Sequence, residues 1–295
     1  MSVKIILGNK KRFVYKASRS NNRDRTGQYV SGAVKFVFEN GFWKDVKAFV
    51  RIVPLPKCPL SYEFANGKMV PEEIAKTKSL VNEPGILVPS NFRFGKNPVI
   101  GDPRTHVLLF YDRLPEEINF LAHALNEDGT FSETDAKIFF AQLYMTCEGL
   151  LKNHKIAVRN LAPSQILYDK NLKLPKLFRF DDIAEIEKCS DIELVRLGNC
   201  PDAYVPPDVC SSELVPLGKL LSYQLGQLLY TLVVGAPFSG TEQYPLTVSP
   251  AMRRFIRSCL REKRRIQFLR IRKSSFFKES VEVYHEFLKK IGHSL

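Results

Sequence analysis

Two amide side chains, Asn160 and Gln165, stand in a segment that reads Val-Arg-Asn-Leu-Ala-Pro-Ser-Gln-Ile-Leu. An amide cannot accept a proton at neutral pH, whereas a general base contributes on the order of 10²–10⁴-fold to a reaction. Ala162, between the two amides, carries no charge and cannot stabilise a negative group, although such electrostatic stabilisation is usually the largest catalytic contribution. Gln165 keeps an amide oxygen on a longer arm, which disfavours regular metal geometry. These residues predict a loop without the groups needed for group transfer.

Residues 154–169 resemble the catalytic loop of protein kinases, whose pattern is H-R-D-L-K-P-x-N-I-L. In that family the Asp accepts the proton of the substrate hydroxyl, the Lys steadies the transferring phosphate and the Asn holds a Mg²⁺. Asn160, Ala162 and Gln165 occupy those three positions here. The structural members of the pattern remain, namely Leu161, Pro163, Ile166 and Leu167. The resemblance therefore implies the frame of a kinase loop without its chemistry.

Two later segments extend the resemblance. Residues 204–209 are similar to the Y-x-A-P-E-V segment of kinases, with Asp208 in place of the Glu that pairs with an Arg, and both Arg264 and Arg265 are open as its partner. Residues 220–235 resemble the central buried helix of the family, with Leu221 where that helix has an Asp. The family's Asp tethers the catalytic loop through hydrogen bonds, and a Leu can make none. We therefore expect the loop to have lost this support.

The metal-binding segment is also altered. With one inserted residue, Arg179-Phe180-Asp181 takes the place of the kinase Asp-Phe-Gly, so that a cation stands where the chelating acid belongs. An ungapped alternative, residues 176–178, offers no acid either. Because Mg²⁺ requires oxygen ligands, the resemblance predicts no metal at this position. Asp181 and Asp182 lie next to it, and a rescue of the site by either residue stays open.

The N-terminal part resembles the family less closely. Residues 48–51 are similar to V-A-I-K and place Arg51 at the phosphate-pairing Lys, while Glu73 corresponds to the Glu with which that Lys pairs. A structural Arg51–Glu73 ion pair is the alternative to a nucleotide-binding role. Residues 7–17 have one glycine of the three in the kinase glycine loop, and their bulky side chains obstruct a close approach to phosphate. Weakened nucleotide contact is the expectation.

Composition restricts the class of protein further. With 295 residues and 44% hydrophobic content, the chain is long enough for one two-lobed unit or two ordinary domains. Six cysteines without C-x-x-C spacing favour a reducing compartment, cytoplasmic or nuclear. The five histidines show no ligand-like pairing, and polar residues interrupt the most apolar stretch. We expect no metal site, no transmembrane segment and no secretory signal.

The charge is the second informative feature. The chain has 44 Lys and Arg against 31 Asp and Glu, a net charge of +13, and residues 253–273 contain ten of these cations. Such a cluster predicts attraction to an acidic protein, nucleic acid or an anionic membrane, and Arg261, Lys263 and Arg265 are the candidate partner-binding residues. Apolar residues alternate with the cations, so solvated faces of core helices are the alternative.

Local patterns predict the main elements. The chain is strand-rich to about Leu114, with a strand at residues 107–111, and helix-rich afterwards. Ser132 and Asp135 predict the start of a long helix, and another is expected to begin near Ser249. A final amphipathic helix is predicted from four apolar residues on one face, Val281, Tyr284, Leu288 and Ile291.

Together these patterns predict an α+β, two-lobed protein-kinase-like fold over residues 1–295, with a β-rich N-lobe of about 1–111 and a mainly helical C-lobe of about 115–295. The degenerate positions Arg51, Glu73, Asn160, Ala162, Gln165 and Arg179 imply an inactive kinase-like protein, a pseudokinase, that is not an enzyme and needs no cofactor. It is expected to act as a scaffold or allosteric regulator of protein partners, such as an active kinase or another signalling enzyme. The alternatives are a nucleotide-binding enzyme with a non-standard transfer and a basic nucleic-acid-binding protein.

Overall fold

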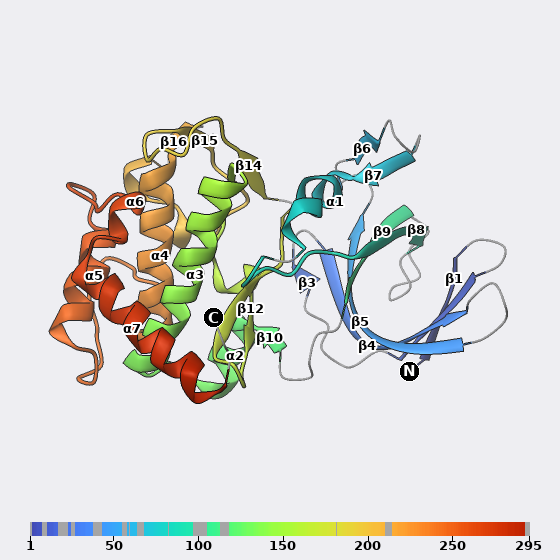
Figure 1. Cartoon of the computed structure of the whole chain (residues 1–295), viewed down its shortest axis with the longest axis horizontal. Coiled ribbons are helices and arrows are strands. Elements are labelled where there is room, and N and C mark those ends of the chain that lie inside the picture. The colour runs from blue at the N-terminus through green and yellow to red at the C-terminus, as the bar shows by residue number, and fades with distance from the viewer. Residues whose placement is uncertain are drawn as a thin grey trace. The chain divides into compact units, whose positions relative to one another are not determined.

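The chain divides into two compact units in a computed structural model (Figure 1). Unit 1 comprises Met1–Val81 and Leu87–Glu116, and unit 2 comprises Asn82–Ile86 and Glu117–Leu295. Strands dominate unit 1 and helices dominate unit 2, which together make an α+β chain. The structure describes residues 2–7, 11–16, 23–24, 27–37, 43–54, 58, 60–63, 68–81, 83–96, 105–112, 118–180, 182–209 and 214–292, with the backbone alone before Arg51.

Unit 1 is built on an antiparallel sheet with the order β1-β2-β4-β5-β9-β8, and β3 pairs with β4 at its end. The central pairs place Val50 opposite Phe110 and Arg51 opposite Leu109. The predicted strand at residues 107–111 is confirmed as part of β9, and its side chains Val107, Leu109 and Tyr111 are fully buried. The strands of the sheet are β1 (Ser2–Leu7), β2 (Lys11–Lys16), β3 (Arg23–Asp24), β4 (Gly27–Val37), β5 (Trp43–Pro54), β8 (Asn91–Lys96) and β9 (Thr105–Asp112).

A hairpin and a short helix complete the described part of unit 1. The strands β6 (Leu60–Glu63) and β7 (Lys68–Pro71) pair antiparallel, and β7 leads directly into α1 (Glu72–Thr77) and the 3₁₀ turn η2 (Lys78–Leu80). Glu72 and Glu73 lie in the first turn of α1, where carboxylates complement the positive end of the helix dipole. This turn presents Glu73 to the interior, where only 7% of it is exposed.

Unit 2 packs its helices around two long central ones, α3 and α4 (Figure 1). α3 packs against α7, and α4 packs against α5 and α6. A cluster of aromatic rings joins α3, α5 and α7, including a stacked pair of Phe255 and Phe276 with centroids 4.4 Å apart. The helices are α2 (Leu121–Asp128), α3 (Glu133–Asn153), α4 (Leu217–Val234), α5 (Pro250–Leu260), α6 (Phe268–Ile271) and α7 (Ser275–Lys290).

Three small antiparallel sheets are formed by strands between α2 and α4 and by β10, which immediately precedes α2. They are β10 (Ile118–Phe120) with β12 (Ile166–Asp169) and β13 (Leu174–Leu177), β11 (Ile156–Val158) with β14 (Ile183–Glu185), and β15 (Leu194–Arg196) with β16 (Leu214–Pro216). Three 3₁₀ turns lie among them, η3 (Pro163–Gln165), η4 (Asp202–Tyr204) and η5 (Pro207–Val209). The loop between β11 and β12 is thereby fixed at both ends.

Local signals account for the helix boundaries. The Ser132 hydroxyl accepts a hydrogen bond from the Asp135 N–H at 3.1 Å, and the Ser249 hydroxyl accepts one from the Met252 N–H at 3.2 Å, so both predicted helix starts are confirmed. α4 ends at Gly235, whose φ of 88° is a left-handed conformation that suits glycine. The predicted apolar face of the last helix is one residue too long, because Ile291 lies past the end of α7 and is 36% exposed.

Within the described parts of the chain, no helix has the length and apolar character needed to cross a membrane. The described cysteines, Cys58, Cys147, Cys189, Cys200 and Cys259, are all free thiols. Burial raises the pKa of both Cys147 and Cys259 to about 12, which keeps these thiols protonated and unreactive. Cys147 and Cys259 thus behave as small apolar side chains of the helical core.

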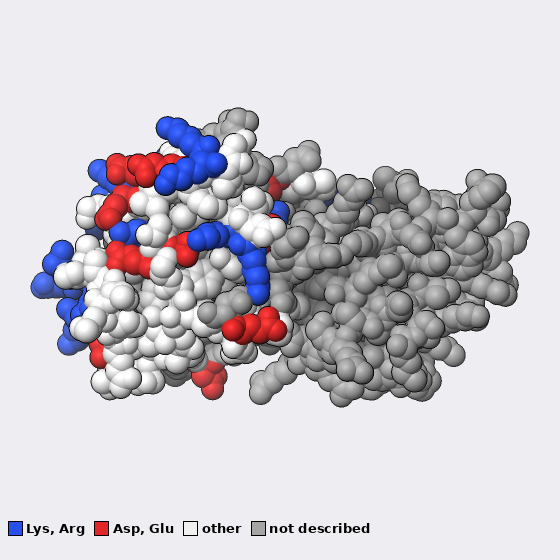
Figure 2. Space-filling model, turned by 90° about the horizontal axis from the view of Figure 1, so that it is seen from below, with Lys and Arg blue, Asp and Glu red and all other residues white. Residues whose placement is uncertain are grey.

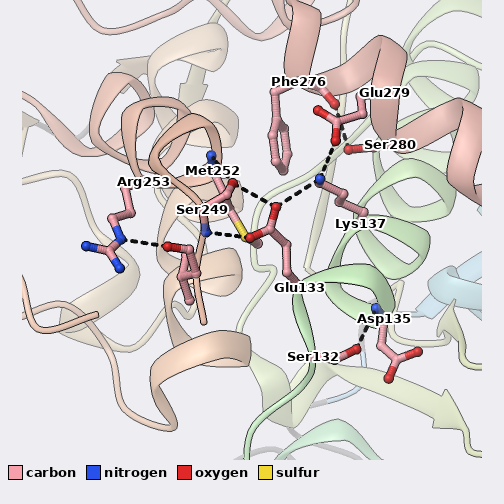
Figure 3. A network of polar contacts seen from close by, with 11 residues as sticks. Ser132, Glu133, Asp135, Lys137, Ser249, Met252, Arg253, Phe276, Glu279 and Ser280 are labelled. Atoms are coloured by element: carbon pink, nitrogen blue, oxygen red, sulfur yellow. Dashed lines mark hydrogen bonds and ion pairs between the residues drawn. The ribbon is translucent and has the colours of Figure 1, made fainter. Parts of the chain in front are cut away.

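A charged network joins the N-terminal ends of α3 and α5 to the side of α7 (Figure 3). Glu133 accepts hydrogen bonds from the Ser249 N–H at 2.6 Å and the Ser249 hydroxyl at 2.8 Å. Lys137 lies 2.9 Å from Glu133 and also pairs with Glu279 of α7. Burial raises the pKa of Glu133, but the hydrogen bonds from Lys137 and Ser249 outweigh it, and the pKa is lowered overall. The Glu133 carboxylate therefore stabilises the contact of three helices.

We predict that Glu133→Gln lowers the free energy of unfolding by about 1–3 kcal/mol at neutral pH, because it removes charged hydrogen bonds. The lowered pKa means that the contribution is present above the unfolded value of 4.5 and is lost as pH falls through the folded value. Urea unfolding at several pH values should show the difference from the unmodified protein shrinking below about pH 4.5. Exposed Glu286 provides the control, as Glu286→Gln should change little. A difference that stays constant into acid would contradict this role for Glu133.

Candidate functional site

The loop between β11 and β12 carries Asn160, a residue singled out by the kinase resemblance, which is only 6% exposed. Its Nδ2 donates a hydrogen bond to the Asn199 carbonyl at 2.7 Å. Its Oδ1 accepts one from the Ala162 N–H at 3.0 Å and lies 3.7 Å from the Cys200 thiol. Both ends of the amide thus hold the protein's own backbone. Asn160 serves as a structural bridge between this loop and the segment at residues 199–200.

The Gln224 side chain on α4 holds the same loop through hydrogen bonds to its backbone. Its Oε1 accepts a hydrogen bond from the Leu161 N–H at 3.2 Å, and its Nε2 donates one to the Arg159 carbonyl at 2.9 Å. Leu221, at the position that aligns with the kinase Asp, is buried. The prediction that the loop has lost its support is therefore wrong: Gln224, three residues farther along α4, provides it. An amide can do so because it both donates and accepts.

The Arg159 side chain forms an ion pair with the nearby carboxylate of Asp182. Its Nη2 lies 2.8 Å from Asp182 Oδ1, its Nη1 donates to the Arg196 carbonyl at 3.1 Å, and its backbone N–H donates to the Asp182 carbonyl at 3.3 Å. A side chain at Gly198 would collide with the Asp182 carboxylate, so glycine permits this close approach. Asp182, one of the two acids considered as a metal ligand, is therefore paired with Arg159. Asp181, the other acid, lies outside the described residues.

Ala162 and Gln165 are the other two loop residues that the kinase resemblance singled out, and their described contacts bring no acid or cation to the loop. Ala162 is buried, and the Gln165 amide donates to the hydroxyl of its neighbour Ser164 at 3.1 Å. Arg179 is 8% exposed, and the flanking Phe178 and Phe180 are both buried, so burial does not decide between the two alignments of this segment. Across the part of the chain that the structure describes, no group of three or more His, Cys, Asp or Glu side chains could hold a metal ion.

Arg51 and Glu73 meet in unit 1. Arg51 on β5 and Glu73 on α1 form an ion pair with Nη1 and Oε2 2.8 Å apart, and the two side chains are 1% and 6% exposed. Tyr111 Oη lies 3.5 Å from the other Glu73 oxygen. The ion pair that stood as the alternative to a nucleotide-binding role is therefore present, between residues 22 positions apart.

Of Arg264 and Arg265, the two predicted partners of Asp208, Arg265 forms the ion pair. Arg265 Nη2 lies 2.8 Å from Asp208 Oδ1, and its guanidinium lies over the Tyr223 ring at 5.1 Å. Burial raises the pKa of Asp208, but Arg265 and then Lys219 lower it, and the pKa is lowered overall. The Arg265 side chain is 2% exposed. The prediction that Arg265 binds a partner is therefore wrong, because it lies inside the protein and anchors Asp208.

The other basic residues between positions 253 and 273 differ in their exposure and in their contacts. Arg261 and Lys263, the other predicted partner-binding residues, are exposed, and so is Arg264. Figure 2 shows Lys and Arg side chains standing out at the left edge of unit 2, with Asp and Glu side chains farther in. Other members of the cluster have intramolecular partners, which are Glu242 for Arg257, Glu148 for Arg272 and the Val248 and Pro245 carbonyls for Arg253.

Comparison with known proteins gives neither a family model nor a curated protein that this chain matches. The geometry around the loop, and not a relative, therefore carries the functional argument. Sequence reasoning missed Gln224, although one signal was visible: polar Gln224 and Gln227 interrupt an otherwise apolar run, and both are completely buried. A buried amide needs hydrogen-bond partners, so such an interruption indicates a backbone segment packed against the helix.

We predict that Gln224→Leu lowers the free energy of unfolding by about 2–4 kcal/mol, since each buried polar group left unsatisfied costs about 1–3 kcal/mol. The Leu161 amide should also exchange its hydrogen faster, because it loses its acceptor. Chemical denaturation and hydrogen-exchange mass spectrometry measure the two effects. Gln243→Leu, in an exposed position, is the control. Unchanged exchange at residues 159–162 would contradict the tether.

Arg264 and Arg265 should respond in opposite ways. Arg265→Ala removes a buried side chain that lies over Tyr223 and leaves Asp208 with Lys219 as its remaining cation, so it should lower the free energy of unfolding by about 1–3 kcal/mol. Arg264 has a φ of 58°, a left-handed conformation, so that Arg264→Gly should leave stability unchanged or raise it by up to about 1 kcal/mol. Thermal and urea unfolding compare the variants. Equal losses in both would show that the assignment of Arg265 to Asp208 is wrong.

Proposed function

We propose that this chain is a protein-kinase-like protein without phosphotransferase activity, a pseudokinase, which acts as a scaffold or allosteric regulator by binding other proteins. The observation that carries the proposal is the state of Asn160. Its uncharged amide is hydrogen-bonded on both sides to the protein backbone. A residue in that state neither accepts a proton nor reaches a substrate hydroxyl.

The kinase-like part of the proposal is supported by pairs of residues that the resemblance aligned independently. Arg51 meets Glu73 across 22 positions, and Asp208 meets Arg265 across 57 positions. The loop at Asn160 is tethered to the helix that the resemblance aligned with the kinase central helix. A chance match of short motifs gives no reason for these distant segments to come together. The β-rich unit 1 and the helical unit 2 follow the same order along the chain as the lobes of a kinase.

The loss of activity is supported by charge. Phosphoryl transfer depends almost entirely on positioning and on the stabilisation of developing charge by metal ions and cations. Ala162 offers no cation, and Asp182 is paired with Arg159. The position aligned with the metal-chelating acid is the buried Arg179. No single substitution restores such a set of groups. Protein binding is the remaining activity of the fold, with an active kinase or another signalling enzyme as the kind of partner.

We predict no transfer of phosphate from labelled ATP to generic protein substrates or to the chain itself. Asn160→Asp should not revive transfer, because the cation at the Ala162 position and the metal ligands stay absent. A radiometric assay with an active kinase as positive control measures both proteins. Activity that follows the purified chain and disappears in an Asn160→Ala variant would overturn the proposal.

Nucleotide binding separates the proposal from its main rival, an enzyme that performs another transfer on the same fold. A ligand present at about 100 times its dissociation constant adds about 2.7 kcal/mol of stability to the native state. Thermal unfolding with ATP, with and without Mg²⁺, should show a small or absent shift that does not depend on the metal. A large shift that requires Mg²⁺ would favour the enzyme and a metal site at Asp181 or Asp182.

A further inference from the structure

The solvent side of α5 carries a basic stripe. Arg254 and Arg257 lie three residues apart on one face of α5, Arg261 follows as the C-cap residue, and all three are exposed. The stripe continues past the end of the helix into Lys263 and Arg264, which are also exposed. We call these five residues the α5 stripe. Its opposite side packs into the core through Met252, Phe255, Ile256 and Cys259, so the orientation of the stripe is fixed by burial.

Most of the stripe has no intramolecular counter-charge. Arg257 pairs with Glu242, with Nη2 and Oε2 2.6 Å apart. In the described part of the chain no ion pair neutralises Arg254, Arg261, Lys263 or Arg264. From residue 253 to residue 273 the sequence contains a single acid, Glu262. With Glu262 as the one acid among them, these cations carry a net positive charge that is more favourable when a negatively charged surface lies against it.

A fully exposed leucine is held at the beginning of this helix. Leu246 is 98% exposed in the loop between α4 and α5. Two arginines of α5 brace that loop: Arg253 donates to the Pro245 carbonyl at 3.0 Å and to the Val248 carbonyl at 2.9 Å, and Arg257 binds Glu242 through two hydrogen bonds. The hydrogen bond to Pro245, the residue just before Leu246, places the leucine beside the N-terminal half of α5. A braced loop presents this apolar side chain without a further loss of conformational entropy on binding.

We infer that Leu246 and the α5 stripe form a docking surface for an acidic segment of a partner protein, in which Asp and Glu side chains surround an apolar contact for Leu246. The inference rests on the proposed function, since it names the surface and the partner chemistry of that protein binding. An apolar contact with a charged rim is the usual composition of a protein–protein interface.

Nucleic acid and membrane fit this surface less well. Single-stranded nucleic acid binds through exposed aromatic rings, but Phe255 and Phe268 are buried, and Tyr244 is covered by the Arg253 guanidinium at 5.5 Å. Duplex DNA is bound mainly through its charged phosphates, and an apolar side chain such as Leu246 contributes nothing to such contacts. A membrane surface takes up several apolar side chains, and Leu246 is the one large apolar residue that is strongly exposed between Gly235 and Ser274.

Binding of two labelled peptides to the full chain, measured by fluorescence anisotropy, tests the surface. One peptide contains Glu and Leu, the other Glu and Ser, with the same number of acids. We expect the Glu/Leu peptide to bind more tightly. A triple variant, Arg254→Glu with Arg261→Glu and Lys263→Glu, should weaken it by about tenfold or more, since three rim pairs of about 0.5 kcal/mol each are lost. Leu246→Ser should weaken the Glu/Leu peptide by about tenfold and leave the Glu/Ser peptide unchanged.

The matched control carries the same change of charge elsewhere in unit 2. Lys278, Lys289 and Lys290 are exposed on α7, and their reversal to Glu should leave peptide binding within about twofold at moderate salt, where distant charges are screened. Thermal unfolding confirms that all variants are folded. Equal losses in both triple variants, or no effect of Leu246→Ser on the Glu/Leu peptide, would overturn the inference.

A labelled DNA duplex is the second probe. Tighter binding of the duplex than of either peptide, lost with the α5 reversals, would assign the surface to nucleic acid and overturn the inference as well. None of these outcomes depends on phosphate transfer. If peptide binding fails while the chain shows no phosphotransferase activity, only the docking surface is refuted; if transfer is found, the proposed function fails whatever the peptides do.

Discussion

The side-chain amide of Gln224 is the contact on which the described arrangement of unit 2 around the loop depends. It lies completely buried in α4 and satisfies the Leu161 N–H and the Arg159 carbonyl together. Without it, backbone groups of the loop would stay unpaired against an apolar helix, at about 1–3 kcal/mol for each buried group. The loop so fixed presents Asn160 to Asn199 and Arg159 to Asp182. These contacts, together with the pairing of β11 and β14, hold the segment at residues 182–200 against the loop.

This network works with mostly neutral groups. A carboxylate can only accept hydrogen bonds, whereas Gln224 and Asn160 each both donate to and accept from the backbone. Burial of an amide with both partners also avoids the desolvation penalty of a buried charge. The two amides therefore hold the loop through backbone contacts that do not depend on protonation, and an amide neither accepts a proton at neutral pH nor supplies a charged metal ligand.

Sequence patterns predicted the features that depend on local chemistry. Ser132 and Ser249 cap helices because their hydroxyls need only the next turn, and the strand at residues 107–111 follows from its apolar run. The Arg51–Glu73 pair came from the kinase resemblance. The choice between Arg264 and Arg265 was not accessible, because it depends on a left-handed turn at Arg264 that sends its neighbour inward. Gln224 was missed for a similar reason: only the packed loop shows which polar residue of the helix lies beneath it.

The described charged side chains are of two kinds: some are buried in ion pairs, and others are exposed on the surface. Inward charges such as Arg51, Glu73 and Arg265 each have an oppositely charged side chain within 2.8 Å, and the loss of that contact would disfavour the folded state, so they are committed to the fold. Exposed cations at the end of α5 have no such commitment, since surface pairs contribute only about 0–1 kcal/mol. Repulsion among Arg261, Lys263 and Arg264 disfavours the isolated protein slightly, and an acidic neighbour removes it. In the described part of the chain no ion pair compensates these exposed cations, so association with an acidic surface is the contact that would do so.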